Sequence, residues 1–489
     1  MRPLEATLVA TLILAFLIEM TSVTRLVRRL FVALVTVLFV LHVYREGAHY
    51  QMLPAYLAWA ILIGLQFSAA SGRILLRPWL KSFAIVGAMS LCALSLALSY
   101  SLPMFTLPPP TGSYSVGTTI LYLTDQSRHE DAVSNPQARR ELVVQVWYPA
   151  LPSNNRLAPY RRLKETRFRN SYQSVLWTNS RLDAPVAQAG APFPVVLFNH
   201  GWGGRRSGDT FLTEELASHG YVVVSIDHPY IAARVELSGG RIVDESDVAL
   251  QFWNWDSVTS ADRIADWNKE LDKWTADQVF VLNSVAAANL DPHSPFFGRL
   301  NTNVVGTAGH SFGGAAALEV SGVDSRILSA VNMDGWTFGG LRYRTSPKPV
   351  MLLYEEASRP NLAYLHSADR YKRFVSEFDA ADDAVVSPSL NRYGGYRIYI
   401  RDTTHDDFTD LPLSSPFRSL SKGGLIPPAR METIIRSYVV GFFDKTLKGK
   451  ASPLLDSGQT TPYSEVEFEA RTPEGSIPAF ASSSASSGH

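Results

Sequence analysis

The sequence predicts an α/β domain built on a mostly parallel sheet, preceded by a bundle of about four transmembrane helices. In the second half of the chain, short β-type runs alternate with helical patterns, which is typical of a parallel sheet covered by helices on both faces. The first hundred residues instead contain long apolar stretches with few charges. The 489 residues are 46% hydrophobic and carry no formal net charge, so the chain can form substantial cores.

Four apolar stretches define the predicted membrane region, residues 1–106. They cover residues 4–20, 30–44, 53–70 and 82–105. A helix needs about 20 mostly apolar residues to cross the hydrocarbon core, so the first two stretches are marginal by length. A cleaved signal peptide is the alternative for the first stretch, but residues 20–23 make a poor cleavage site. We therefore predict four spans, with two or three spans as the alternative.

Basic residues are unevenly distributed among the short loops of this region. Six follow the first and third stretches, against only Arg2 at the start and Arg45 in the middle loop; the six are Arg25, Arg28, Arg29, Arg73, Arg77 and Lys81. Loops rich in Lys and Arg stay in the cytoplasm, so the N-terminus and the residues beyond 105 are expected outside. We predict an integral protein of a bacterial inner membrane, with the α/β domain on the periplasmic or extracellular side.

Composition excludes several function classes. The charges are balanced and form no long basic run, so the chain lacks the electrostatic footprint of a nucleic-acid-binding protein. The single cysteine, Cys92, excludes an intramolecular disulfide framework and a thiolate metal site. No cluster of histidine and carboxylate residues has metal-ligand spacing, and the Gly-rich loop at 201–204 lacks the lysine of a phosphate-binding loop. We therefore expect no metal and no cofactor, and the oligomeric state stays open.

The rest of the chain divides into three parts. Residues 107–114 are rich in proline and predict an extended linker, and residues 115–450 form the α/β domain. Strands are expected at 141–148, 194–198, 221–226, 303–308, 330–333, 349–354 and 396–400, and helices at 209–218, 261–288, 312–320, 362–378 and 430–447. Residues 451–489 turn polar and end in a Ser-rich run, so we expect a disordered tail.

The most informative motif is Gly309-His310-Ser311-Phe312-Gly313, which follows one predicted strand and opens an alanine-rich helix. A serine on a sharp turn between strand and helix has a strained backbone that exposes its hydroxyl group. Glycines two residues before and two after it let the strand and the helix pass closely. Ser311 is therefore the predicted nucleophile, and the residue before it is expected to point away from the hydroxyl group.

A nucleophilic serine needs a histidine base, and the histidine needs a carboxylate to fix its tautomer. With this motif, both follow later strands in the order serine, acid, histidine. Asp334 stands directly after the strand at 330–333 and is the predicted acid. The rival position is the end of the next strand, where Glu355 and Glu356 stand.

The predicted base is His405, which follows the strand at 396–400 in a polar loop. Of the other histidines beyond the acid, His366 lies in a helical pattern and His489 in the tail. The loop also holds four acidic residues, Asp402, Asp406, Asp407 and Asp410. We expect these to be solvated charges or helix caps, one of which could orient the histidine loop.

The oxyanion of an acyl-transfer intermediate needs preformed donors, usually two backbone amides. The amides of Phe312, after the nucleophile, and of Trp202, in the Gly-rich turn after the strand at 194–198, fit this role. The long segment between 228 and 300 carries four more tryptophans. Trp267 and Trp274 have helical spacing and are expected in the core, whereas Trp253 and Trp255 are candidates for an apolar lining of the site.

These residues resemble the α/β-hydrolase superfamily and, within it, the plasma-type platelet-activating factor acetylhydrolases and their bacterial relatives, with motifs shared by dienelactone-hydrolase-like enzymes. The similar segments are residues 195–201, 216–223, 309–315, 333–336 and 404–410. The resemblance covers roughly residues 115–447. It implies an α/β-hydrolase fold, and it favours Asp334 over Glu355 because the acid of that family follows the strand just after the elbow helix.

The resemblance also implies hydrolysis of carboxylic esters, with removal of short acyl chains from glycerophospholipids as the named activity. We therefore expect a membrane-anchored serine esterase that acts on amphiphilic lipid esters. The same mechanism on non-lipid or polymeric esters is one alternative. A non-catalytic membrane sensor or binding module on the hydrolase fold is the other, although such a module has no physical need for a complete triad. Acyl-chain length and headgroup preference stay open.

Overall fold

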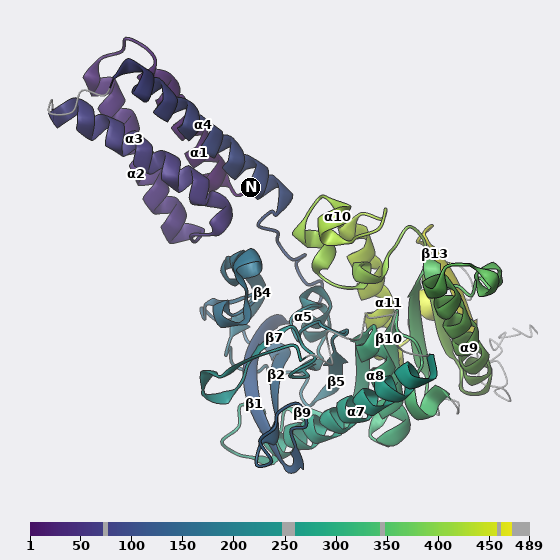
Figure 1. Ribbon diagram of the computed structural model, residues 1–489. Helices are drawn as coiled ribbons and strands as arrows, with labels where there is room; N and C mark the ends of the chain where they lie inside the picture. The colour runs from purple at the N-terminus through teal and green to yellow at the C-terminus, as the bar shows by residue number, and fades with distance from the viewer. Residues whose placement is uncertain (72–76, 247–259, 343–347, 457–460, 472–489) are drawn as a thin grey trace, which may run out of the picture.

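The computed structural model describes residues 1–71, 77–246, 260–342, 348–456 and 461–471. Four long helices form a bundle that projects from an α/β domain (Figure 1). The bundle helices are α1 (Pro3–Glu19), α2 (Arg25–Arg45), α3 (Leu53–Ser71) and α4 (Pro78–Ser101), with the short 3₁₀ turn η1 (Tyr50–Met52) before α3. These bounds agree with the four apolar stretches of the sequence.

Three segments of the bundle are long and apolar enough to cross a membrane: Arg25–Arg45, Tyr50–Ser68 and Pro78–Ser101. Helix α1 has 17 residues, which is near the lower limit for a span. The helices pack around a small core that includes Leu12, Phe16 and Cys92, while many outward side chains are apolar and exposed. An apolar outer surface is expected of helices surrounded by lipid. Three candidate spans are thus present, and the fourth span stays a prediction.

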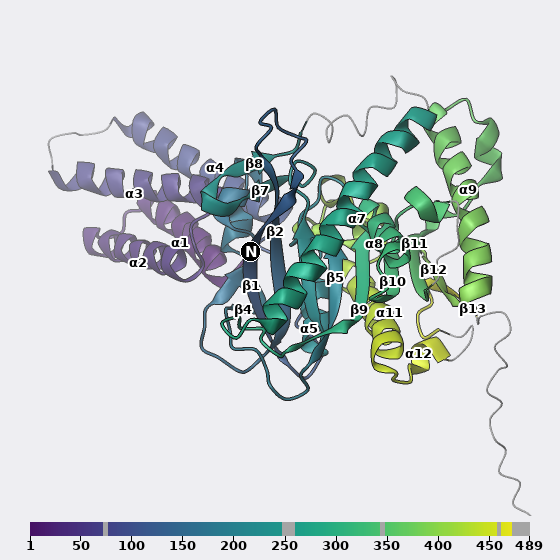
Figure 2. The same ribbon diagram turned by 90° about the horizontal axis from the view of Figure 1, so that it is seen from below.

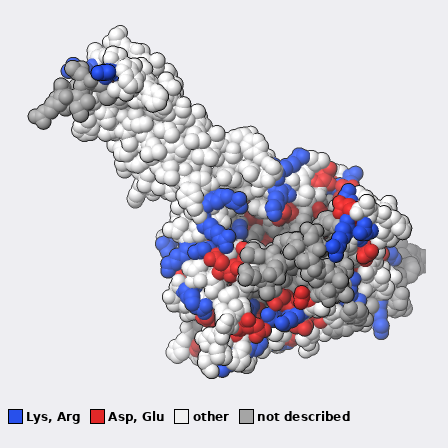
Figure 3. All heavy atoms as spheres, in the orientation of Figure 1, with Lys and Arg blue, Asp and Glu red and all other residues white. Residues whose placement is uncertain are grey.

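Lys and Arg side chains gather at the end of the bundle far from the α/β domain (Figure 3). Glu19, at the end of α1, forms ion pairs with Arg28 at 3.7 Å and Lys81 at 2.9 Å, so the start of α2 and the start of α4 lie side by side. The opposite end contacts the α/β domain. There Arg2 Nη2 donates to the carbonyl of Val175 at 3.3 Å, and Ser415 Oγ donates to the carbonyl of Ser101 at 2.5 Å.

The α/β domain is built on an eleven-stranded sheet in the described part of the chain, in the order β13-β12-β11-β10-β9-β5-β6-β2-β1-β4-β3. Six neighbouring strands from β12 to β6 are parallel. The strands are β1 (Ser115–His129), β2 (Arg139–Ala150), β3 (Leu157–Pro159), β4 (Trp177–Leu182), β5 (Phe193–Asn199), β6 (Val222–Asp227), β9 (Leu300–His310), β10 (Ile327–Met333), β11 (Val350–Glu355), β12 (Gly395–Ile400) and β13 (Val466–Arg471). A separate hairpin pairs β7 (Arg234–Glu236) with β8 (Ile242–Asp244).

Helices cover both faces of this sheet (Figure 2). Strand β5 shows why, because Val196 and Phe198 belong to the core on the side of α5 and α11, whereas Val195 and Leu197 belong to the core on the side of α7. Strands buried on both faces read as continuous apolar runs. The helices are α5 (Thr210–Ser218), α7 (Ser260–Leu290), α8 (Phe312–Val323), α9 (Arg370–Tyr393), α10 (Arg418–Ser421), α11 (Pro428–Lys448) and α12 (Pro453–Asp456). The predicted fold class, a mostly parallel sheet between helices, is confirmed.

Two predicted elements need correction. The helix expected over 362–378 is a short 3₁₀ turn, η7 (Leu362–His366), followed by α9, because the Asp369 carboxylate accepts from the amide of Lys372 and starts a new helix there. The tail expected from residue 451 instead contributes α12 and β13, which pairs antiparallel with β12. Val466 and Phe468 alternate with glutamates and are buried, a strand pattern that the polar composition obscured. Residues 472–489 lie outside the described residues.

The linker packs against the domain. Residues 107–111 have no regular secondary structure and residues 112–114 form bends, and the amides of Thr111 and Tyr114 donate to groups on α5. The first strand, β1, is not among the predicted strands. It pairs antiparallel with β2 from Ser115 to Asp125 and again at His129, with an irregularity between them.

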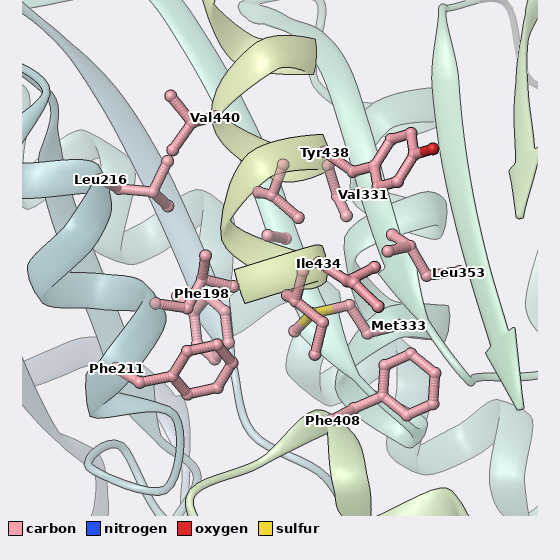
Figure 4. Close-up of a cluster of buried hydrophobic side chains, with 14 of the residues drawn as sticks. Phe198, Phe211, Leu216, Val331, Met333, Leu353, Phe408, Ile434, Tyr438 and Val440 are labelled. Carbon is pink, nitrogen blue, oxygen red and sulfur yellow. The ribbon is translucent and has the colours of Figure 1, made fainter. Parts of the chain in front are cut away.

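A large apolar cluster under one face of the sheet fixes the strand ends that carry the predicted acid and base (Figure 4). Met333 and Leu353 contribute from β10 and β11, and Ile434 contributes from α11. Phe408, which is fully buried, lies in the same cluster. Asp334 directly follows Met333 and His405 precedes Phe408 by three residues, so one core positions both.

Candidate active site

Ser311 lies on a sharp turn between β9 and α8. Its backbone has φ 56° and ψ −126°, a strained conformation for a residue with a side chain. A Cβ atom on Gly309 would lie 2.2 Å from the carbonyl oxygen of Gly313, and one on Gly313 would lie 2.3 Å from that of Asn199. Only glycine fits at either position, so the geometry that the motif predicts is present.

The structure brings the three predicted side chains together at the carboxyl ends of neighbouring strands. Ser311 Oγ lies 2.9 Å from His405 Nε2, and His405 Nδ1 lies 2.6 Å from Asp334 Oδ2. A carboxylate only accepts hydrogen bonds, so Nδ1 carries a proton, and in a neutral imidazole Nε2 is then free to accept from the serine hydroxyl group. This is the arrangement of a nucleophile, a base and an orienting acid.

Electrostatics favours charge separation between the acid and the base. Burial lowers the pKa of His405, but the hydrogen bond and the charge of Asp334 outweigh it and the net shift of the pKa is upward. Burial raises the pKa of Asp334, and the hydrogen bond from His405 outweighs this, so that the net shift is downward. Asp334 therefore stays ionised and stabilises the imidazolium that forms when His405 accepts a proton.

The carboxylate of Asp334 is held from both sides. While Oδ2 faces His405, Oδ1 accepts from the backbone amide of Glu355 at 3.0 Å and from Ser358 Oγ at 2.9 Å. The residue itself has φ 55°, a left-handed conformation that turns its side chain out of the strand direction. These contacts fix the carboxylate orientation before any substrate binds.

Two of the four acidic residues in the histidine loop are buried and structural. Asp407 Oδ2 accepts from the amides of Thr404 and Gly424, both at 2.7 Å, and so closes the turn η8 (His405–Phe408). The carboxylate of Asp410 accepts from the first two amides of α5, at 2.8 and 3.1 Å, which caps that helix. The expectation of helix caps thus holds for Asp410, while Asp407 braces the loop that carries His405.

His310 makes a contact that the sequence did not reveal. Its Nε2 lies 2.9 Å from the carbonyl oxygen of His405 and donates to it. Burial, followed by the neighbouring His405, lowers the pKa of His310 to about 3, so the ring is a neutral donor. The position between Gly309 and Ser311 tolerates many residue types in this motif. No sequence signal marked His310 as a support for the base.

The Gly-rich turn after β5 lies against the elbow. Strands β5 and β9 are parallel neighbours in which Asn199 aligns with Gly309, so the loops after them meet. A Cβ atom on Gly201 would lie 3.0 Å from Ser311 Cβ, and the rings of Trp202 and Phe312 pack edge to face with centroids 5.0 Å apart. The two segments whose amides are the predicted oxyanion donors therefore flank the serine, and their oxyanion role stays a prediction.

A buried polar network lies beneath this turn, and sequence reasoning missed it because its histidines precede the serine. His228 Nδ1 donates to Asp277 at 2.8 Å, and Arg140 donates to the same carboxylate from two nitrogens, at 3.2 and 2.7 Å. The His228 ring stacks on Trp274 with centroids 3.8 Å apart, and its backbone amide donates to His200 Nε2 at 3.3 Å. The network thus links α7 to the base of the Gly-rich turn.

The site opens into a cavity of about 360 Å³. Its apolar lining comes mainly from Phe312, Trp336, Phe338, Tyr364 and Val375, and its charged groups are Asp334, Glu355, Arg359, Lys372, Asp379 and His405. Trp336 Nε1 donates to Asp379 Oδ1 at 2.8 Å, which fixes the indole ring at the cavity wall. Trp336 belongs to segment 333–336, one of those that carry the family resemblance, but its place in the cavity is not among the predictions.

The four tryptophans of the long segment have different outcomes. Trp267 and Trp274 are buried in the aromatic core, as expected from their helical spacing. Trp253 and Trp255 lie outside the described residues, so their predicted place at the site is untested.

Two groups of titratable side chains come close enough to hold a metal ion, in the part of the chain that the structure describes. One is Asp334 with Glu355 and His405, and the other is Glu5 with His42 and Glu46 in the bundle. Asp334, Glu355 and His405 lie 21 residues or more apart, whereas His42 and Glu46 are four residues apart on α2 and only Glu5 is distant from them. In the bundle, His42 Nδ1 lies 3.0 Å from Glu46 Oε2, as in an ordinary hydrogen-bonded pair. That no metal is needed stays a prediction.

Comparison with known proteins matches most of the α/β domain. Residues 101–237 and 265–451 match the model of the family described as platelet-activating factor acetylhydrolase, isoform II. A probable 1-alkyl-2-acetylglycerophosphocholine esterase of Arthroderma benhamiae is 26% identical over 430 residues, which cover 78% of this chain and 99% of that protein. The platelet-activating factor acetylhydrolase of Cavia porcellus is 22% identical over 327 residues, which cover 63% of this chain and 70% of that protein.

A solved structure is similar as well. The ferulic acid esterase from Streptomyces cinnamoneus superposes with a TM-score of 0.59 at 30% sequence identity, over 74% of this chain and 99% of that one. The family match begins at residue 101 and therefore leaves the bundle outside it.

Proposed function

The chain belongs to the platelet-activating factor acetylhydrolase, isoform II, family and is a carboxylic ester hydrolase, and we propose that it is a membrane-anchored serine esterase that removes short acyl chains from phospholipids or related lipid esters. The observation that carries the mechanism is the continuous hydrogen-bonded line from Ser311 through His405 to Asp334. The observation that carries the substrate is the family itself, whose relatives are named for such esters.

In the proposed mechanism, His405 Nε2 accepts the proton of Ser311 while the serine oxygen attacks the ester carbonyl carbon. The negative charge that develops on the carbonyl oxygen is stabilised by the amides of Trp202 and Phe312. The imidazolium, paired with Asp334, then returns the proton to the departing alcohol and leaves an acyl group on Ser311. Water, deprotonated by the same histidine, releases the acid and restores the enzyme.

We propose that the bundle is the membrane anchor and that the α/β domain lies on the outer side. Support comes from Arg28 at the start of α2 and Lys81 at the start of α4, which both pair with Glu19 at the end of α1. A periplasmic reporter fused at residue 456 is expected to be active, and a cytoplasmic reporter at the same place inactive. An active cytoplasmic reporter would contradict this orientation and leave the esterase mechanism untouched.

A second substrate class has specific support. The ferulic acid esterase is an esterase whose name points to an aromatic acid, and the cavity beside Ser311 carries the rings of Trp336 and Phe338. Flat aromatic walls pack well against an aromatic acyl group. Esters of aromatic acids are therefore the second candidate, and they share the proposed mechanism.

A substrate panel separates the two classes. With detergent-solubilised protein, we expect kcat/KM for a 2-acetyl phospholipid to exceed that for its 2-palmitoyl analogue by about 10²-fold or more, because a cavity of about 360 Å³ cannot enclose a long chain. Methyl ferulate at matched concentration is the comparison. A kcat/KM for methyl ferulate above that for the acetyl phospholipid would assign the enzyme to aromatic esters.

A further inference from the structure

A second carboxyl group, that of Glu355, lies beside the predicted acid Asp334. Glu355 ends β11, the strand next to β10, and its backbone amide donates to Asp334 Oδ1 at 3.0 Å. One oxygen of Glu355, one of Asp334 and one ring nitrogen of His405 all lie within 4.8 Å of one another. Glu355 also lines the cavity beside Ser311. The histidine thus faces two carboxyl groups from two adjacent strand ends.

We propose that Glu355 is a second acid of this site, a positioning residue that can hold the His405 imidazole in its active tautomer when Asp334 is absent. The inference rests on the proposed serine esterase mechanism and deepens it. In the intact site Asp334 keeps the hydrogen bond to His405, because the backbone amide of Glu355 and the hydroxyl group of Ser358 hold its carboxylate in place. Without that carboxylate, the side chain of Glu355 can turn toward His405 Nδ1. From a separation of at most 4.8 Å, its oxygen reaches hydrogen-bond distance by moving closer by about 2 Å or less.

The charges around the pair are consistent with this arrangement. Burial, followed by the charge of Asp334, raises the pKa of Glu355 to about 8, while the pKa of Asp334 is lowered. The two carboxyl groups therefore carry about one negative charge at neutral pH, as expected when like charges share a site. The other titratable and charged groups around the pair are His310 before the elbow, Arg359 after β11, Asp406 and Asp407 in η8, and Lys372 and Asp379 on α9.

The nature of the residue that replaces Asp334 then decides the outcome. Asparagine keeps the acceptor for Glu355 and Ser358, but its amide group donates to His405 Nδ1 and holds the wrong tautomer, so Glu355 cannot act. Alanine removes the amide and leaves space. We therefore expect Asp334→Ala to be more active than Asp334→Asn. If both variants only lost the orienting acid, alanine would have no such advantage.

The test measures kcat/KM for Asp334→Ala, Asp334→Asn, Glu355→Gln and the double variant Asp334→Ala/Glu355→Gln in the full-length protein. We expect Asp334→Asn to lose about 10⁴-fold and Asp334→Ala only about 10²-fold, and the double variant to fall to about the level of Asp334→Asn. The activity of every variant should rise with pH as His405 loses its proton, and Asp334→Ala should show an additional rise as Glu355 ionises. Only this additional rise should be absent from the double variant. A merely structural Glu355 would not produce that pH dependence.

Controls separate the possible failures. Glu356 is exposed and accepts from the amide of Asp402 instead of facing the cavity, so Asp334→Ala/Glu356→Gln should match Asp334→Ala. Thermal unfolding identifies a variant that has not folded, and Asp334→Ser, whose hydroxyl group can accept from the Glu355 amide, then takes the place of alanine in both variants. Equal activity of Asp334→Ala and Asp334→Ala/Glu355→Gln overturns the role of Glu355. Activity that survives in Ser311→Ala overturns the serine mechanism instead.

Discussion

Replacing Ser311 with alanine is expected to lower kcat by between about 10⁴- and 10⁶-fold without changing the fold. The reason is that Ser311 Oγ is the atom 2.9 Å from His405 Nε2 and the proposed nucleophile, so nothing else can form the acyl-enzyme at this position. The measurement is hydrolysis of a 2-acetyl phospholipid by detergent-solubilised protein. A fluorophosphonate probe should label the wild-type protein at Ser311 and fail to label the variant.

The matched control is Ser321→Ala, on the same helix α8 as the residue after the nucleophile. Ser321 is buried, and its hydroxyl group donates to the carbonyl of Leu318, so the variant loses only a local hydrogen bond. We expect normal labelling and normal turnover. Hydrolysis by Ser311→Ala at the wild-type rate would reject the serine mechanism, and absent labelling of folded wild-type protein would favour a non-catalytic module.

The features that could be predicted from the sequence are those that depend on neighbouring residues in the chain. The elbow could be found because only glycine avoids clashes of 2.2 to 2.3 Å at positions 309 and 313. The strand before it also ends in a buried stretch of small and apolar residues at 305–309. Asp334 and His405 could be found because parallel strands place their carboxyl ends at one edge of the sheet. The main helices and the six central strands could also be predicted, because each one is marked by the pattern of apolar and polar residues along a single short segment.

The supports of the site could not be predicted, because each depends on residues distant in the sequence. His310 matters through the carbonyl of His405, 95 residues later, and Asp410 matters because it meets the first turn of α5, 200 residues earlier. The polar composition at the C-terminus hid β13, whose alternating Val466 and Phe468 are buried only because β12 lies beside them. In β13 the alternation of apolar residues with glutamates is too short, in a polar segment, to indicate by itself that another strand lies beside it.

Replacing Asp277 with alanine is expected to cost about 3–5 kcal/mol of unfolding free energy, the largest stability effect among the residues near the site. Asp277 is fully buried and accepts from His228 and from two nitrogens of Arg140. Its removal leaves the buried Arg140 guanidinium with the Glu130 carboxylate at 2.8 Å and the Pro229 carbonyl at 3.4 Å. It also takes away the carboxylate that pairs with Arg128 at 2.8 Å. An uncompensated buried charge costs far more than the net gain from the intact pair.

Chemical denaturation of the solubilised protein measures this effect, with Asp272→Ala, an exposed carboxylate on the same helix α7, as the control. Asp277→Asn keeps an acceptor for His228 but loses the charge, so its loss should be intermediate if Arg140 dominates. Arg140 and His228 together hold the pKa of Asp277 far below its usual range, so the carboxylate stabilises the fold above about pH 4 and loses this effect as the pH falls further. The difference between wild type and Asp277→Ala should therefore shrink on acidification. A difference below about 1 kcal/mol at pH 7 would show that Arg140 finds another partner, and the network beneath the Gly-rich turn would then have little structural weight.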